Sequence, residues 1–230
     1  MPPPIVYKAT VVQAGLLLPP AWIVEVVEAA LRARAADRVL VPRRQHIESA
    51  GNTLLTMPAL GEGYCGVKLV SVAPGDSARA LPVTNGVMDV HGCARVVGER
   101  TARDHGNDVQ RACSAGRGGL LAYKHFIAVG SYRPDMQELP NAVFRLSGCL
   151  AIDSDHALNE SGDVLNPVRR GVLREQDVLQ MEECVTGQRS VRVVGTTAYK
   201  SAGAAFYDLY VARAFYEAAQ ARGLGRAVDL

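Results

Sequence analysis

The sequence predicts an α/β (α+β) protein, with a mixed sheet in its first half and parallel strands in its second half. Several apolar strands with short connections lie between residues 39 and 90, and two continuous apolar runs near residues 126 and 149 are typical of buried parallel strands. Helical periodicity precedes the first group and follows the last. A chain of 230 residues with 48% hydrophobic and 21% charged residues is long enough to bury a core in one large domain or two small ones.

A surface helix followed by a series of strands is expected in the first half. Pro20 favours a first helical turn, and a single apolar stripe follows it at helical spacing, made of Ile23, Val26, Val27, Ala30 and Leu31. Turn residues then separate strands expected at 39–47, 52–57, 64–72 and 83–90. Such short connections favour antiparallel pairing, or a mixed sheet.

The second half begins with a polar region. Residues 93–119 are crowded with Arg, Asp, Gly and Asn, which predicts a loop, or a short helix around 108–113. Strands are then expected at 126–130, 149–153 and 191–197, and helices at 136–146, 175–184 and 203–222. Gly223 provides a stop signal for the last helix.

Composition excludes several function classes. The net charge of +2 is too small for a nucleic-acid surface, and the early apolar run is broken by Gln13, Pro19 and Pro20, so no membrane span is expected. A cytoplasmic protein is the expectation. The cysteines show neither zinc nor redox spacing, which favours a reduced protein without a metal, although a nucleophilic thiol stays an alternative. They are Cys65, Cys93, Cys113, Cys149 and Cys184.

Several separate segments resemble the ornithine cyclodeaminase and mu-crystallin family in residue type, order and spacing. They are Val41–Ile47, Leu54–Ala59, Gly66–Val72, Leu81–Gly86, Phe126–Leu139, Glu160–Asp163, Tyr199–Gly203 and Asp208. The resemblance implies a substrate-binding and dimerising domain, with a Rossmann domain inserted before the final helix. It also implies action on amino acids, imino acids or ketimines with a nicotinamide nucleotide. We therefore expect a substrate-binding/dimerisation domain at 1–95 and 190–230, and a truncated Rossmann-like remnant at 96–189.

Arg44 and Lys68 match the positions at which the family holds the substrate carboxylate. A guanidinium clamps a carboxylate through two parallel hydrogen bonds, and a lysine adds a point charge and a possible proton relay. Arg43 adjoins Arg44. Because neighbouring strand residues face opposite sides, only one of the two arginines enters the pocket, and the sequence leaves open which. The alternative is that these arginines form a solvent-exposed basic end of a strand and have no binding role.

Three further positions are candidates for substrate binding. Thr84 and Asn85 lie where the family places a polar residue that faces substrate, but both also suit an ordinary turn before Gly86. Arg100 begins an Arg-Thr-Ala segment that resembles a further carboxylate ligand of the family. Its charged flanks do not fit the usual apolar helix, so a chance match is the alternative.

Tyr132 stands where the resemblance implies an aspartate that acts as acid or base. A tyrosine with an ordinary pKa of about 10 mostly donates hydrogen bonds instead, which argues against ornithine cyclodeamination. We therefore assign Tyr132 and Lys68 as the catalytic candidates. Asp135 is expected to cap the start of the helix at 136–146.

The glycine-rich unit of a Rossmann site is not recognisable in the sequence. Such a site needs a strand, a Gly-x-Gly-x-x-Gly turn and a helix, whereas Gly116–Gly119 lacks this spacing and follows no apolar strand. The sequence therefore predicts no cofactor, with the first half of the Rossmann domain missing. Its loss would expose an apolar sheet edge.

The expected function is cofactor-independent acid–base chemistry of a lyase, cyclase or isomerase type. Its substrate would be a small amino or imino acid or a related carboxylate, in specialised metabolism. One alternative is a non-catalytic relative that binds a small ligand or dimerises. Another is a truncated NAD(P)-dependent amino-acid or imine oxidoreductase. The expected assembly is a homodimer formed through the N-terminal sheet.

Overall fold

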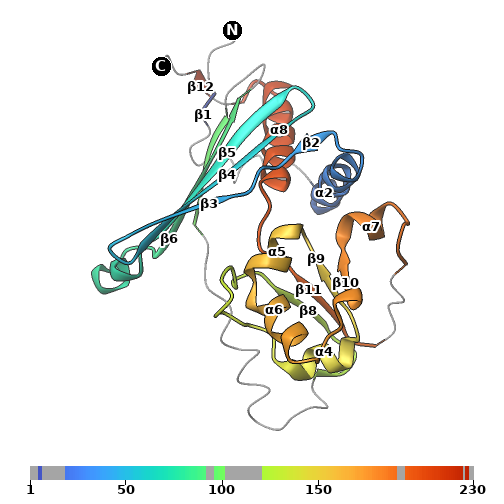
Figure 1. Cartoon of the computed structure of the whole chain (residues 1–230). Helices are drawn as coiled ribbons and strands as arrows, with labels where there is room; N and C mark the ends of the chain where they lie inside the picture. The colour runs from blue at the N-terminus through green and yellow to red at the C-terminus, as the bar shows by residue number, and fades with distance from the viewer. Residues whose placement is uncertain are drawn as a thin grey trace. The chain divides into compact units, whose positions relative to one another are not determined.

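Two units make up the chain in the computed structural model, which describes residues 5–6, 19–91, 96–101, 121–190, 195–224 and 226–227 (Figure 1). Unit 1 comprises Met1–Arg103 and Ala205–Leu230, and unit 2 comprises Asp104–Ala204. These boundaries differ from those expected at 95/96 and 189/190. The reason is that strand β7 (Val96–Thr101) joins the sheet of unit 1, and β11 (Thr197–Lys200) joins the sheet of unit 2.

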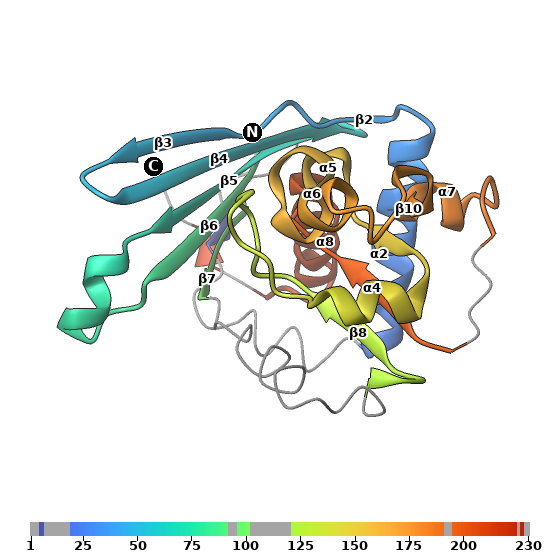
Figure 2. The same cartoon turned by 60° about the horizontal axis from the view of Figure 1, so that its bottom comes forward.

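The sheet of unit 1 is mixed, as predicted. All of its neighbouring strands are antiparallel except β1 and β7, which pair in parallel. Figure 2 shows the long central strands side by side, with the η1 turn (Pro74–Arg79) joining two of them. The order across the sheet is β12 (Arg226–Ala227), β1 (Ile5–Val6), β7, β6 (Thr84–His91), β5 (Tyr64–Val72), β4 (Asn52–Gly61) and β2 (Val39–Leu40), with β3 (Gln45–Ser49) also paired to β4.

Helices α2 (Pro20–Ala35) and α8 (Ala205–Gln220) confirm the two helices expected in this unit. They pack on each other, and α8 lies against β4, β5 and β6. Small residues on the sheet permit this approach, because a Cβ at Gly66 would lie 3.3 Å from the Leu209 side chain and 2.8 Å from the Asp89 carbonyl oxygen. The sheet face under α8 is therefore the inner face of unit 1.

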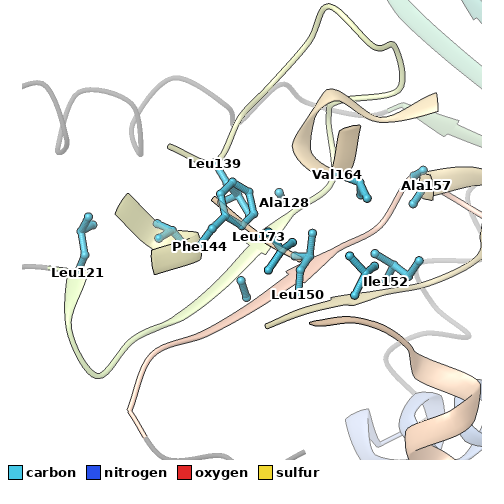
Figure 3. Packing of buried hydrophobic residues seen from close by; sticks show 13 residues of the cluster. Leu121, Ala128, Leu139, Phe144, Leu150, Ile152, Ala157, Val164 and Leu173 are labelled. Atoms are coloured by element: carbon cyan, nitrogen blue, oxygen red, sulfur yellow. The ribbon is translucent and has the colours of Figure 1, made fainter. Parts of the chain in front are cut away.

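Unit 2 has a parallel sheet with the strand order β10, β9, β11, β8. Its core gathers Phe144, Leu150, Ile152 and other apolar side chains between the sheet and the helices (Figure 3). The elements, besides β11, are β8 (His125–Ala128), α4 (Asn141–Ser147), β9 (Leu150–Ile152), α5 (Asp155–Glu160), α6 (Gly162–Arg169), η3 (Glu175–Asp177), β10 (Val178–Gln180) and α7 (Met181–Val185).

Several element predictions are wrong in detail. The strand expected at 39–47 is divided into β2 and β3. The helix expected at 136–146 begins only at Asn141, because Pro140 stands at its N-cap, and Asp135 instead pairs with Arg133. The helix expected at 175–184 is a 3-10 turn, a strand and a short helix. The strand expected at 191–197 begins at Thr197, with 191–194 outside the described residues. Of the polar region at 93–119, residues 96–101 form β7, and the rest up to residue 119 lies outside the described residues.

No helix among the described residues is long and apolar enough to cross a membrane.

Among the described glycines, Gly162 leaves the least room for a Cβ atom. A Cβ there would lie 2.2 Å from the Met136 carbonyl oxygen and 2.7 Å from that of Pro134, both backbone atoms. We expect Gly162→Ala to lower the free energy of unfolding by about 2 kcal/mol, because overpacking outweighs the better helix propensity of alanine. Urea denaturation measures this change. The control is Gly75→Ala, since a Cβ at Gly75 meets nothing within 4 Å. Equal stability of Gly162→Ala and wild type would contradict this packing.

Candidate functional site

Arg44 and Lys68 lie in one row across the inner face of unit 1. Lys68 on β5 pairs with Met57 on β4, and Gln45 at the start of β3 pairs with Thr56. The β3–β4 register, extended by one residue, therefore sets Arg44 opposite Met57. Directly opposed residues share a face, and adjacent strands lie about 4.8 Å apart, so the two cationic residues flank Met57 about 10 Å from each other at the backbone.

Burial distinguishes the two arginines that the sequence left ambiguous. Arg44 is 7% exposed, whereas Arg43 is exposed. Both precede β3, and only position 44 is in phase with the inner face. Arg44 is therefore the arginine that can meet a ligand on that face, as strand alternation requires of one of the two.

Lys68 is held by an acidic residue of α8. Its Nζ donates a hydrogen bond to Asp208 Oδ2 at 2.9 Å, and the side chains are 22% and 14% exposed. Asp208 belongs to a segment that the sequence comparison singled out, but no role was assigned to it. An ammonium has three donors, so the contact with Asp208 leaves Lys68 with donors for a ligand.

The other sequence candidates of unit 1 separate onto two faces. Thr84 pairs with Val72, which lies in phase with Lys68, so Thr84 is on the inner face. Asn85 pairs with Ser71 on the opposite face, and its amide donates to the Pro82 carbonyl oxygen at 3.2 Å, which is a turn contact. Arg100 lies on β7, where its backbone pairs with Gly86. The Arg100 side chain lies outside what the structure describes.

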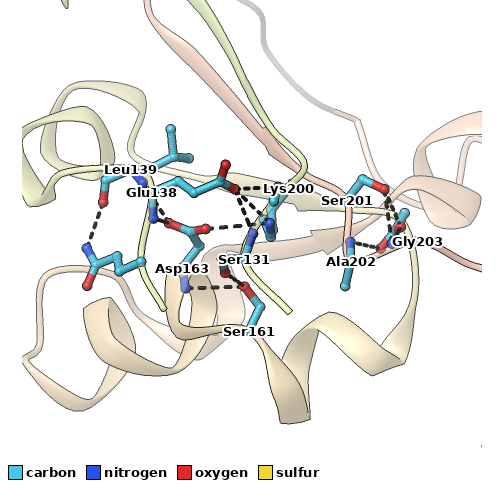
Figure 4. A network of polar contacts seen from close by, with 12 residues as sticks. Ser131, Glu138, Leu139, Ser161, Asp163, Lys200, Ser201, Ala202 and Gly203 are labelled. Atoms are coloured by element: carbon cyan, nitrogen blue, oxygen red, sulfur yellow. Dashed lines mark hydrogen bonds and ion pairs between the residues drawn. The ribbon is translucent and has the colours of Figure 1, made fainter. Parts of the chain in front are cut away.

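The carboxyl ends of the unit 2 strands bring short polar turns together. The strands are parallel, so the residues that follow β8, β9 and β11 meet at one edge of the sheet. Asp153, after β9, accepts hydrogen bonds from the Ser201 hydroxyl at 2.7 Å and from the Gly203 N–H at 2.9 Å (Figure 4). In open α/β sheets this edge is where ligands bind.

A buried lysine joins two carboxylates beside this edge. Lys200, at the end of β11, is fully buried and donates to Glu138 Oε2 at 3.0 Å. Its Nζ also lies 3.6 Å from Asp163 Oδ2, and Asp163 is fully buried as well (Figure 4). Sequence reasoning missed this cluster, which we call the lysine clamp (Lys200, Glu138 and Asp163). The cue available was a lysine at the end of a short strand, within the Tyr199–Gly203 segment that carries part of the family resemblance.

The pKa values of the two carboxylates of the lysine clamp are shifted in opposite directions. Burial acts to raise the pKa of Glu138, but the Ser131 N–H and the Lys200 charge outweigh it and hold that pKa below its usual 4.5. Burial raises the pKa of Asp163 above its usual 3.8, against the Leu139 N–H and Lys200. Glu138 is therefore the more firmly ionised member of the pair.

Tyr132 follows Ser131 at the carboxyl end of β8 and is half-buried. It belongs to unit 2, whereas Arg44, Lys68, Thr84, Asn85 and Arg100 belong to unit 1. The structure thus brings Arg44, Lys68 and Thr84 onto one face of one unit. Among the described side chains, no group of three or more His, Cys, Asp or Glu is arranged to hold a metal ion.

Glu138→Gln tests the ionisation of the lysine clamp. A carboxylate whose pKa is lowered by folding stabilises the native state above its unfolded pKa, and this contribution is lost as the pH falls. We expect the variant to be less stable than wild type by about 2 kcal/mol at pH 7, with the difference shrinking as the pH falls below 4.5. Urea denaturation across this range measures it, with the exposed Glu175→Gln as control. A difference that does not vary with pH would argue against an ionised Glu138.

Comparisons with known proteins were made for the whole chain. No family model matches it. It is 36% identical over 109 residues to a Delta(1)-pyrroline-2-carboxylate reductase of Bacillus cereus, a match that covers 46% of this chain and 34% of the relative. It is 37% identical over 95 residues to mouse ketimine reductase mu-crystallin, which covers 40% of this chain and 28% of the relative. The chain thus spans about a third of the length of these relatives.

Solved structures share the fold. The Thermococcus litoralis Delta(1)-pyrroline-2-carboxylate reductase in complex with NADH and L-proline has a TM-score of 0.79 at 21% identity, covering 97% of this chain and 100% of that chain. An archaeal alanine dehydrogenase dimer with bound NAD has a TM-score of 0.77 at 18% identity, covering 99% of each chain. The probable ornithine cyclodeaminase of Bordetella pertussis has a TM-score of 0.70 at 15% identity, covering 92% of this chain and 96% of that chain.

These findings correct two sequence predictions. The expectation of no cofactor is contradicted, because the similar solved structures include complexes with NADH and NAD. The main functional prediction, a cofactor-independent lyase, cyclase or isomerase, is contradicted with it, because the matched relatives are reductases. The sequence alternative of a truncated NAD(P)-dependent amino-acid or imine oxidoreductase agrees better with them.

The predicted mixed α/β fold and the sequence resemblance are both confirmed. Sequence matches to pyrroline-2-carboxylate reductases and mu-crystallin support the similarity of this chain to the ornithine cyclodeaminase and mu-crystallin family, and the solved structures share its fold.

Proposed function

We propose that this chain serves in the NAD(P)-dependent reduction of a small cyclic imino acid, or the reverse oxidation of the amino acid. The observation that carries the proposal is the row formed by Arg44, Met57 and Lys68 on the inner face of unit 1, within a chain that matches imine reductases. Two cationic side chains on one face, one of them buried, suit a compact carboxylate. Met57 between them offers an apolar contact for a hydrocarbon ring.

Arg44 would clamp the substrate carboxylate. A guanidinium remains charged under all ordinary conditions and offers paired N–H groups in the geometry of a carboxylate. Lys68 would lie beside the substrate nitrogen, where its contact with Asp208 orients the ammonium. An ammonium in that place can protonate the imine nitrogen, and Asp208 balances the ammonium charge before the proton is given up. Thr84 shares this face and would supply a polar contact.

Tyr132 would act in unit 2 as a hydrogen-bond donor to a ligand bound at the carboxyl edge of that unit's sheet. A phenol hydroxyl donates a hydrogen bond and is a much weaker acid than a carboxylic acid. This role differs from that of an aspartate, which would accept the proton. The proposed direction is therefore reduction of an imine rather than deamination that needs a carboxylate base.

The nicotinamide nucleotide would lie at the carboxyl edge of the unit 2 sheet, which fits the ordinary ligand edge of open α/β sheets. Tyr132, Ser154 and Ser201 are the polar side chains there that would hold its nicotinamide end. The cofactor would supply the hydride. The described residues include no glycine-rich turn that would cradle a pyrophosphate, and Gly116–Gly119 lies outside them.

A second reading is a partial oxidoreductase, in which this chain carries the substrate face and part of the nucleotide-binding unit. The coverage of the curated relatives supports it, because the match spans 34% of the Bacillus cereus reductase. Under this reading substrate binding by unit 1 is retained, while nucleotide binding is weak. Measurements of each ligand separately distinguish the two readings.

We also propose a homodimer formed through the outer face of the unit 1 sheet. That face carries exposed apolar side chains in a group we call the apolar face: Leu40, Ile47, Leu54, Leu60 and Leu69. Strand register places them on the side opposite Met57 and Lys68. Apolar residues grouped in this way mark interaction surfaces, and the similar archaeal alanine dehydrogenase is a dimer.

Carboxylate binding by Arg44 is tested with a matched pair of variants. L-proline and NADH or NADPH are titrated separately by calorimetry and by nucleotide fluorescence. We expect both ligands to bind, and Arg44→Leu to weaken proline binding roughly 30-fold, which corresponds to about 2 kcal/mol for a charge-assisted pair. The neighbouring Arg43→Leu removes an exposed arginine and should leave proline binding unchanged. Equal losses in both variants, or no proline binding by wild type, would refute the assignment.

The dimer is tested by placing a charge within the apolar face. Leu69, which is 39% exposed, is replaced by lysine, and the mass in solution is measured by sedimentation. We expect wild type to sediment as two chains and Leu69→Lys as one, because burying an unpaired ammonium in an interface is strongly unfavourable. Leu146→Lys on α4, 46% exposed, is the control and should remain dimeric. A wild-type monomer would rule out this assembly.

A further inference from the structure

The segment between β8 and α4, residues 129–140, is closed on itself by the lysine clamp. Glu138, near its end, accepts hydrogen bonds on Oε2 from the Gly130 N–H at 2.8 Å and the Ser131 N–H at 2.9 Å, both near its start. Gly130 is needed for this approach, because a Cβ there would lie 2.7 Å from Glu138 Oε1. One carboxylate thus fixes both ends of the segment against each other.

Asp163 fixes the same segment to α6. Its Oδ1 accepts from the Glu138 N–H at 2.9 Å and the Leu139 N–H at 2.7 Å. Ser161, the N-cap of α6, shares a 2.6 Å hydrogen bond between its hydroxyl and that of Ser131. The two carboxylates of the lysine clamp together hold four backbone N–H groups of the segment.

Lys200 allows these two carboxylates to lie close together. Asp163 is fully buried and Glu138 is partly buried. Their negative charges repel each other, and a buried ion without a partner is costly. The fully buried Lys200 ammonium contacts both carboxylates, at 3.0 and 3.6 Å, and so compensates much of their charge. Without Lys200, one carboxylate would have to take up a proton or move toward water. Either change would weaken the hydrogen bonds to the segment.

Tyr132 lies between two fixed positions of this segment. Ser131 before it is held by Glu138 and Ser161, and the Arg133 carbonyl after it accepts a hydrogen bond from the Gly162 N–H at 3.1 Å. The backbone on both sides of Tyr132 is therefore anchored by contacts that depend on the lysine clamp and on the start of α6.

We propose that Lys200 is a positioning residue for Tyr132, acting through Glu138 and Asp163 on the segment that carries it. This inference rests on the proposed function, in which Tyr132 donates to the ligand bound at the carboxyl edge of the unit 2 sheet. Lys200 touches no substrate in this account. Its effect on turnover is exerted only through the placement of the tyrosine hydroxyl.

The first arm of the test needs no ligand. Hydrogen exchange of the amides of Gly130, Ser131, Glu138 and Leu139 is compared between wild type and Lys200→Met. We expect exchange about ten-fold faster in the variant, because local opening becomes easier. Lys124→Met removes an exposed lysine of the same unit and should leave exchange unchanged. Unchanged exchange in Lys200→Met would overturn the proposal.

A second variant covers the case in which Lys200→Met does not fold. Asp163→Asn keeps the side-chain shape and an acceptor oxygen but removes the charge. We expect faster exchange mainly at Glu138 and Leu139, whose N–H groups Asp163 accepts, and less change at Gly130 and Ser131. Uniform loosening of all of unit 2 would overturn the proposal, because it would mean general destabilisation.

The second arm is a kinetic double-mutant cycle on the reduction of the cyclic imino acid. We expect Lys200→Met to lower kcat roughly ten-fold or more with little change in KM, since small misplacements of a donor are expensive. In a Tyr132→Phe background the same change should have no further effect on kcat. Additive losses would overturn the proposal. If wild type shows no turnover, the proposed function fails, and the exchange arm alone decides whether Lys200 holds the segment.

Discussion

The order of unit 2 depends on one buried ammonium between two carboxylates. Lys200 and Asp163 are each a residue that burial alone should exclude, and Glu138 beside them is partly buried. Together they offset each other's charge, and Glu138 Oε2 and Asp163 Oδ1 accept backbone N–H groups that no helix or strand satisfies. The segment after β8 is thereby fixed without regular secondary structure. The backbone that follows β8 at the carboxyl edge of the sheet is therefore held in place by this contact.

Unit 1 also pairs a lysine with a carboxylate, but this pair is more exposed than the lysine clamp. Lys68 on the sheet meets Asp208 on α8, and both are only partly buried, so the pair is accessible to a third charged group. Arg44 lies two strands away in the same row. One buried cluster therefore builds the scaffold, while one half-buried pair remains available for chemistry. The difference between them is one of burial rather than of residue type.

The local sequence pattern was sufficient to predict α2, β5 and α8, because each has a long run of regularly spaced apolar residues or clear turn residues at its ends. The local pattern failed to predict β10, because its apolar pair Val178 and Leu179 is too short to distinguish a strand from part of a helix. Lys200 and Glu138 lie far apart in sequence, so no spacing rule could pair them. Register, which only the fold supplies, was needed to place Arg44 with Lys68. The absence of a glycine motif was interpreted as loss of the cofactor, and the relatives contradict this.

Hydride transfer between a nicotinamide and a small imino acid is the reaction that we propose for this protein. The full chain is incubated with Delta(1)-pyrroline-2-carboxylate and NADPH or NADH that carries deuterium at the transferable position, and the product is examined by NMR. We expect proline with deuterium at its α-carbon, and much less of this labelled proline at the same substrate concentration when Arg44 is replaced by leucine. Unlabelled proline, or unchanged imino acid with both nucleotides, would contradict it.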